Sequence, residues 1–120
     1  MAHHQPLREA QAKCRLYLNS VAVREVLLIK IFGSPYTRLE AQVFQFPHHL
    51  QPQNNPPVVD FTHSVQGTSV QLSLARIFNG HIPPMLANAN LPAALNIHAG
   101  HITVDLHYIR QKIDNAQARM

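Results

Sequence analysis

The stretch HITVDLH, from His101 to His107, alternates polar and apolar residues without a break. A β-strand sends alternate side chains to opposite faces, so this stretch predicts a strand with one apolar and one polar face. The apolar face would consist of Ile102, Val104 and Leu106. The polar face would consist of His101, Thr103, Asp105 and His107. Because β-branched residues and a preceding glycine disfavour a helix here, we interpret the stretch as a strand.

The polar face of this strand is the candidate binding site, and we add Arg110 from the residues that follow it. Such a row could titrate near neutrality, because histidine has an unperturbed pKa of about 6.5. At about 3.4 Å per residue, His101 and His107 would stand roughly 20 Å apart, whereas nitrogen ligands lie about 2 Å from a metal. We therefore expect no metal site and no cofactor.

The tetrapeptide HITV at His101 resembles one half of the 2H phosphoesterase signature, in which two His-x-Thr/Ser-x elements face each other across a cleft. This resemblance implies a hydrolase whose two histidines act as acid and base. The second element is missing, since His63 is followed by SVQ, His81 by IPP and His98 by AGH. Without a complete catalytic set, a His-dependent hydrolase or metal protein is the third of our three functional hypotheses.

Both ends of the chain show helical spacing of apolar residues. The N-terminal segment PLREAQAKCRLYL carries them at Leu7, Ala10, Cys14 and Leu18. The C-terminal segment DLHYIRQKIDNAQARM carries them at Leu106, Ile109, Ile113 and Ala116. A helix is therefore predicted at each end.

The first predicted hairpin joins VAVREVLLIKIF to YTRLEAQVFQF through the turn signal GSP at residues 33–35. A three-residue loop would place Phe32 opposite Tyr36 and Ile29 opposite Leu39. This register gives one apolar face. It also places Lys30 opposite Arg38, a contact between like charges.

The second predicted hairpin lies in VVDFTHSVQGTSVQLSLARIF, where two alternating runs flank Gln66 and Gly67. A two-residue turn would place Phe61 opposite Leu72 on an apolar face. His63 would lie opposite Val70 on the same face, so we expect it to be a buried core residue.

Together these segments predict an α+β fold: a small antiparallel sheet of two β-hairpins plus a fifth strand, with an N-terminal and a C-terminal helix. A length of 120 residues fits a single domain spanning 1–120. Within it we expect a Pro-rich connector at 47–57 and a long loop at 79–96. The apolar residues of that loop suggest docking against the domain, namely Ile82, Met85, Leu86 and Leu91.

Composition limits the functional classes. The ten Lys and Arg residues are scattered, and the net charge of +4 reflects the low number of acids. A single cysteine, Cys14, excludes an intramolecular disulfide, and no apolar run is long enough for a membrane span. We therefore expect a cytoplasmic protein, in the host cell interior if the source is viral.

The first functional hypothesis is a non-enzymatic interaction protein, because no complete catalytic set exists. We expect this chain to form a homodimer, because edge strands can pair, and to bind an unidentified protein partner. Its composition would suit an accessory protein of a virus or mobile element. The alternative is a nucleic-acid-binding protein that uses a small basic set on the first helix: Arg8, Lys13 and Arg15.

Overall fold

The computed structural model describes residues 7–20, 23–88 and 90–119, and it confirms the α+β class with a helix at each end. The first half contains α1 (Leu7–Leu18), β1 (Glu25–Gly33), β2 (Tyr36–Gln45), η1 (Pro52–Asn54) and β3 (Val59–Asp60). The second half contains β4 (Ser69–Ser73), α2 (Leu74–Ile77), η2 (Pro84–Asn88), β5 (Leu95–His98), β6 (His101–Asp105) and α3 (Leu106–Ala118).

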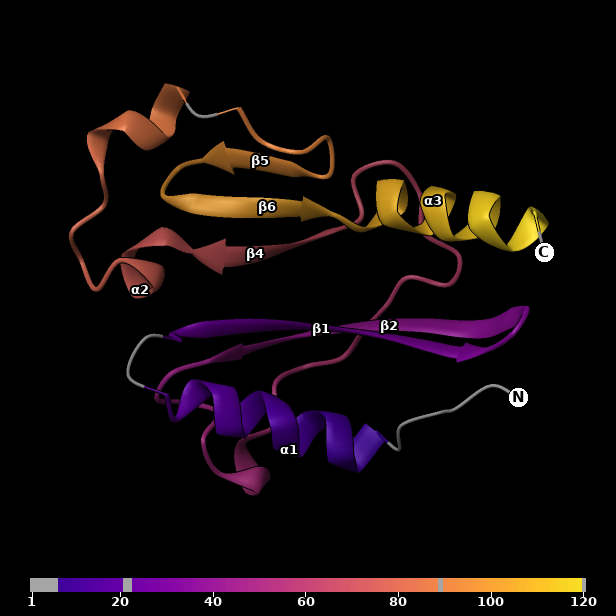
Figure 1. Ribbon diagram of the computed structural model, residues 1–120, viewed down its shortest axis with the longest axis horizontal. Helices are drawn as coiled ribbons and strands as arrows, with labels where there is room; N and C mark the ends of the chain where they lie inside the picture. The colour runs from indigo at the N-terminus through magenta and orange to yellow at the C-terminus, as the bar shows by residue number, and fades with distance from the viewer. Residues whose placement is uncertain (1–6, 21–22, 89, 120) are drawn as a thin grey trace.

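The strands form two antiparallel sheets of three strands each. Sheet A has the order β1-β2-β3 and sheet B has the order β4-β6-β5. In Figure 1, sheet A and α1 occupy the lower part of the molecule, and sheet B occupies the upper part. The short helix α2 lies at one end of sheet B and α3 extends from the other end (Figure 1).

Helix α1 has the predicted apolar stripe, because it buries Ala10, Cys14 and Leu18. The stripe packs on one face of sheet A, where Phe44 is fully buried against Cys14 and Leu18. The helix therefore covers the outer face of the first hairpin.

The first hairpin forms, but its predicted register is wrong by two residues. Ile29 pairs with Ala41, not with Leu39, and Lys30 pairs with Glu40. The register shifts between Phe32 and Gly33, and Gly33 adopts a left-handed φ of 91°. A shift of two residues leaves every side chain on its predicted face, and it replaces a like-charge pair by an opposite-charge pair.

The second predicted hairpin does not form, although a turn at Val65 to Thr68 is present. Strand β3 pairs with β2, with Val59 beside Ala41, and β4 pairs with β6. Phe61 therefore does not oppose Leu72. Alternation of polar and apolar residues predicts strands, but it does not determine which strand becomes the partner.

The burial of the segment after β3 also differs from the prediction. His63 is exposed, whereas Thr62 and Ser64 are buried. The Thr62 hydroxyl accepts a hydrogen bond of 2.9 Å from the Leu39 amide, and the Thr62 amide donates to Asp60 at 2.9 Å. These bonds satisfy the buried hydroxyl and turn the chain out of the sheet, which places His63 in solvent.

One core cluster joins the two sheets. Its buried members come from sheet A, sheet B and the segments beside them: Leu39, Ala41, Phe61, Val70, Val104 and Leu106. Ile109 and Ile113 of α3 pack against this cluster, as their helical spacing predicts. The helix is also tied to the tip of the first hairpin, because Tyr36 bonds Gln117 through its amide and Asp114 through its hydroxyl.

The connector at 47–57 contains turns and η1, and the Gln42 side chain donates to the Pro56 carbonyl at 2.9 Å. The loop at 79–96 contains η2, and it is shorter than predicted because strand β5 begins at Leu95. The docking expected of this loop is wrong for two residues, since Met85 is 81% exposed and Ile82 is 40% exposed.

Candidate functional site

The segment from His101 to Asp105 is a strand, as predicted, and it is the central strand of sheet B. Its polar face continues onto both neighbours, because directly paired residues share a face. Thr103 lies between Gln71 and Asn96, and His101 lies between Ser73 and His98. Sheet B therefore has one polar face three strands wide.

The strand ends earlier than predicted, because Asp105 is the N-cap of α3. Its carboxylate accepts a hydrogen bond of 3.0 Å from the Tyr108 amide. His107 consequently lies in the first turn of the helix rather than on the polar face of the strand. The predicted row is thus divided: His101, Thr103 and Asp105 are on β6, and His107 and Arg110 are on α3.

The side chains on α3 point to the segment that follows β3. His107 Nδ1 lies 3.0 Å from the Ser64 hydroxyl oxygen, and Arg110 donates to the Thr62 carbonyl at 3.3 Å. Ser64 is buried, with only 8% of the residue exposed. The second ring nitrogen of His107, Nε2, lies 3.5 Å from the side-chain amide nitrogen of Gln111. The Ser64–His107 contact therefore joins α3 to the segment that follows β3.

The histidines do not assemble a metal centre among the described residues, where no group of three His, Cys, Asp or Glu is placed to hold an ion. His98 and His101 are register partners at the turn between β5 and β6. His107 lies beyond the opposite end of β6.

The basic set of α1 does not form one patch. At about 100° per residue, Arg8 and Lys13 point roughly 140° apart around the helix. Both are exposed, but Arg15 is half-buried, where it bonds the Asn55 side chain and lies over the Phe44 ring at 5.5 Å. Arg15 is therefore held by contacts within the fold, and Arg8 and Lys13 are the exposed members of the set.

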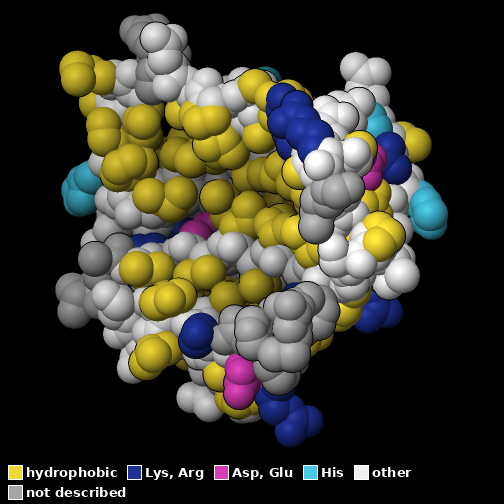
Figure 2. Space-filling model, turned by 45° about the vertical axis from the view of Figure 1, so that its right-hand side comes forward, with side chains coloured by type: hydrophobic (Ala, Val, Ile, Leu, Met, Phe, Trp, Pro, Cys, Tyr) yellow, Lys and Arg dark blue, Asp and Glu magenta, His cyan; other side chains and the backbone are white. Residues whose placement is uncertain are grey.

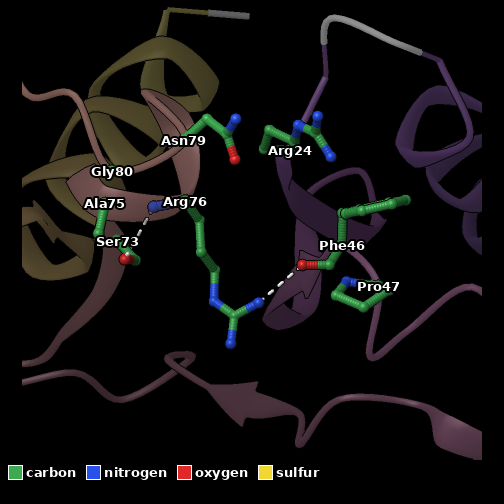
Figure 3. A pocket seen from close by; sticks show the side chains of 8 residues that line it. All are labelled: Arg24, Phe46, Pro47, Ser73, Ala75, Arg76, Asn79 and Gly80. Carbon is green, nitrogen blue, oxygen red and sulfur yellow. Dashed lines mark hydrogen bonds between the residues drawn. The ribbon is translucent and has the colours of Figure 1, made fainter.

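A pocket of about 570 Å³ opens between the end of the first hairpin and α2 (Figure 3). Its lining consists of Arg24, Phe46, Pro47, Ser73, Ala75, Arg76, Asn79 and Gly80. The sequence did not predict this pocket, because its lining comes from three separated segments and no local pattern connects them.

The two sheets are bonded to each other beside this pocket. The Arg76 guanidinium donates to the Phe46 carbonyl at 2.7 Å, and Glu25 accepts from the Ser73 amide at 3.0 Å. Burial raises the pKa of the Glu25 carboxyl, while its hydrogen bonds and the Arg76 charge act in the opposite direction. These contacts fix the walls of the pocket relative to each other.

No helix in the described part of the chain is long and apolar enough to cross a membrane. No protein-family model, curated protein or solved structure matches the chain.

Proposed function

We propose that this chain is a non-enzymatic interaction protein that forms a homodimer through β1. The observation that carries the proposal is an apolar surface left half-exposed between the two sheets. Figure 2 shows hydrophobic side chains gathered around a hollow on one face, both above it and below it. Apolar hollows of this kind mark sites of protein association.

Strand β1 borders this surface and lies at the edge of its sheet. It pairs with β2 on one side, and within the described chain no second strand pairs with it. None of its nine residues is fully buried, and Ile31 is 38% exposed. An edge strand is a template for pairing with another chain, which makes β1 the favoured contact.

The sequence of β1 suits antiparallel pairing with its own copy. A two-fold axis at Ile29 places Leu27 opposite the partner's Ile31, on the face whose Leu27 and Ile29 pack against the core cluster. On the other face, Lys30 lies opposite the partner's Leu28, so the two lysines do not face each other. The pairing is therefore isologous and extends the apolar face across both copies.

A non-enzymatic role is supported by the contacts of the polar residues around β6. Asp105 caps α3, and His107 and Arg110 hold the segment after β3. Side chains engaged in this way stabilise the fold, and they leave no paired acid and base for a catalytic step.

Sedimentation at micromolar concentration tests the proposal. The wild-type chain should sediment as a dimer, and Ile31→Lys should convert it to a monomer by introducing a charge at the interface. Val65→Lys is the matched control, since Val65 is a 69% exposed aliphatic residue that lies outside every strand. A monomeric wild type, or equal effects of the two lysines, would refute the dimer.

Cysteine cross-linking tests the register. Ile29→Cys should form a disulfide between copies, because paired residues at the axis have Cα atoms about 5 Å apart. Leu27→Cys is the control on the same face, since its two copies would be offset by about 14 Å along the strands. Cross-linking of both variants at equal rates would contradict this register.

A further inference from the structure

The pocket between the first hairpin and α2 brings two cationic side chains to one opening. Arg24 reaches it from the residue before β1, and Arg76 reaches it from α2. Figure 3 shows Arg24, Phe46 and Pro47 on one wall, with Arg76 and Asn79 on the other. The two arginines are far apart in the sequence and come together only because the two sheets pack against each other.

Each arginine is held in position by a contact that leaves donors available. The Arg24 guanidinium lies over the Phe46 ring at 4.6 Å, and stacking engages the face of the group rather than its N–H edges. Arg76 donates to the Phe46 carbonyl through one nitrogen, and a guanidinium carries five N–H donors. Both cations are therefore ordered before any ligand arrives.

The charge around the pocket favours an anion. Its lining contains no aspartate or glutamate. The polar side chains in the lining are those of the two arginines, Ser73 and Asn79. Among the described residues, the only salt bridge joins Arg38 to Glu40, so neither pocket arginine is paired at that distance with a described carboxylate. Glu25 is not part of the lining, and its Oε1 atom accepts hydrogen bonds from the Ser73 amide and the Gln45 side chain.

We propose that this pocket binds a phosphate group. Guanidinium groups donate two parallel hydrogen bonds to phosphate oxygens, and a phosphate dianion matches the charge of two arginines. A volume of about 570 Å³ accommodates a ligand of nucleotide size around that group. The phosphate belongs either to a free small molecule or to a nucleic-acid backbone, and the two sources share this recognition chemistry.

Calorimetric titration of the full chain tests the proposal with three probes: inorganic phosphate, adenosine monophosphate and a short single-stranded oligonucleotide. Acetate at equal ionic strength is the control for general charge effects. Saturable binding of at least one phosphate probe, without binding of acetate, is the expected result. A monophosphate that binds more tightly than the oligonucleotide indicates a small-molecule ligand, and the reverse order indicates a nucleic-acid backbone.

Two arginine variants locate the site. Arg24→Gln should weaken phosphate binding by about tenfold or more, since a hydrogen bond between charged groups is lost. Arg38→Gln is the matched control, because Arg38 also lies over a phenylalanine ring, at 4.2 Å from Phe32, but it is not part of the pocket lining. The control should bind like the wild type.

A third variant separates loss of phosphate binding from loss of the fold. Asn79 has a left-handed φ of 51°, so Asn79→Gly removes its amide without straining the backbone. It should weaken binding while circular dichroism stays unchanged. The proposal is overturned if no phosphate probe binds saturably, or if Arg24→Gln and Arg38→Gln weaken binding equally.

Discussion

At the scale of single residues, the histidines of this chain have distinct roles that sequence pattern does not separate. His107 contacts Ser64, His101 Nδ1 lies 3.1 Å from the Ala99 carbonyl, and His63 is exposed. The alternating pattern placed His63 in the core, because it assumed that the strand continues past Asp60. The hydrogen bonds of Thr62 end the strand instead. A hydropathy pattern does not predict that a side-chain hydroxyl, here that of Thr62, will accept the hydrogen bond that a strand partner would otherwise accept.

His49 provides a prediction at this scale. Its Nδ1 accepts a hydrogen bond of 2.9 Å from the Gln45 amide, so that nitrogen must be unprotonated in the fold. Burial, followed by the charges of His48, Arg76 and Arg15, lowers the pKa of His49. The unfolded chain therefore takes up the proton at a higher pH than the folded chain. Stability from this group is complete above about pH 6.5 and is lost as the pH falls through the lowered pKa.

Urea unfolding measured from about pH 7.5 to 5 checks this expectation. The free energy of unfolding should fall with pH in the wild type and fall less steeply in His49→Asn, which cannot titrate. His81→Asn serves as the control, because His81 is an exposed loop residue. Equal slopes for wild type and His49→Asn would show that this histidine does not contribute.

At the scale of elements, periodicity predicted helices α1 and α3 and the strands β1, β2, β3, β4 and β6, although β3 is only two residues long. Periodicity failed on the partners of β3 and β4, because their pairing depends on long-range packing that a local pattern does not contain. Strand β6 became the centre of sheet B, and its partner β5 (Leu95–His98) begins inside the segment 79–96 that was predicted as a long loop. Gly33 in the sequence indicated an irregular turn at this position. The size of the register shift between β1 and β2 depends on the geometry of that turn, which the sequence does not give.

Asp105 provides the prediction at this scale. As the N-cap of α3, it satisfies the Tyr108 amide, which otherwise has no partner within the helix. Asp105→Ala should lower the free energy of unfolding by about 1 kcal/mol, whereas Asp105→Asn should be nearly neutral, since asparagine caps helices as well as aspartate. Chemical denaturation compares the two variants. If asparagine is as damaging as alanine, the charge of Asp105 matters rather than its capping bond.

At the scale of the whole molecule, the two sheets share one core cluster but leave an apolar hollow between them. The sequence predicted that the strands have apolar faces, because polar and apolar residues alternate along them. It could not predict which of them stay uncovered, or that Arg24 and Arg76 meet in one pocket. Both properties arise from the relative placement of the sheets, which follows from the partners of β3 and β4.

The proposed dimer gives the prediction for the whole molecule. If folding and association are coupled, a tenfold rise in protein concentration should add about 1.4 kcal/mol to the apparent free energy of unfolding per dimer. The urea midpoint of the wild type should therefore rise with concentration. Ile31→Lys should unfold at a lower midpoint that does not change with concentration, because the monomer has no partner to lose. Val65→Lys should retain the dependence of the wild type. A wild-type midpoint that is constant over a hundredfold range of concentration would mean that the apolar hollow is not covered by a second copy.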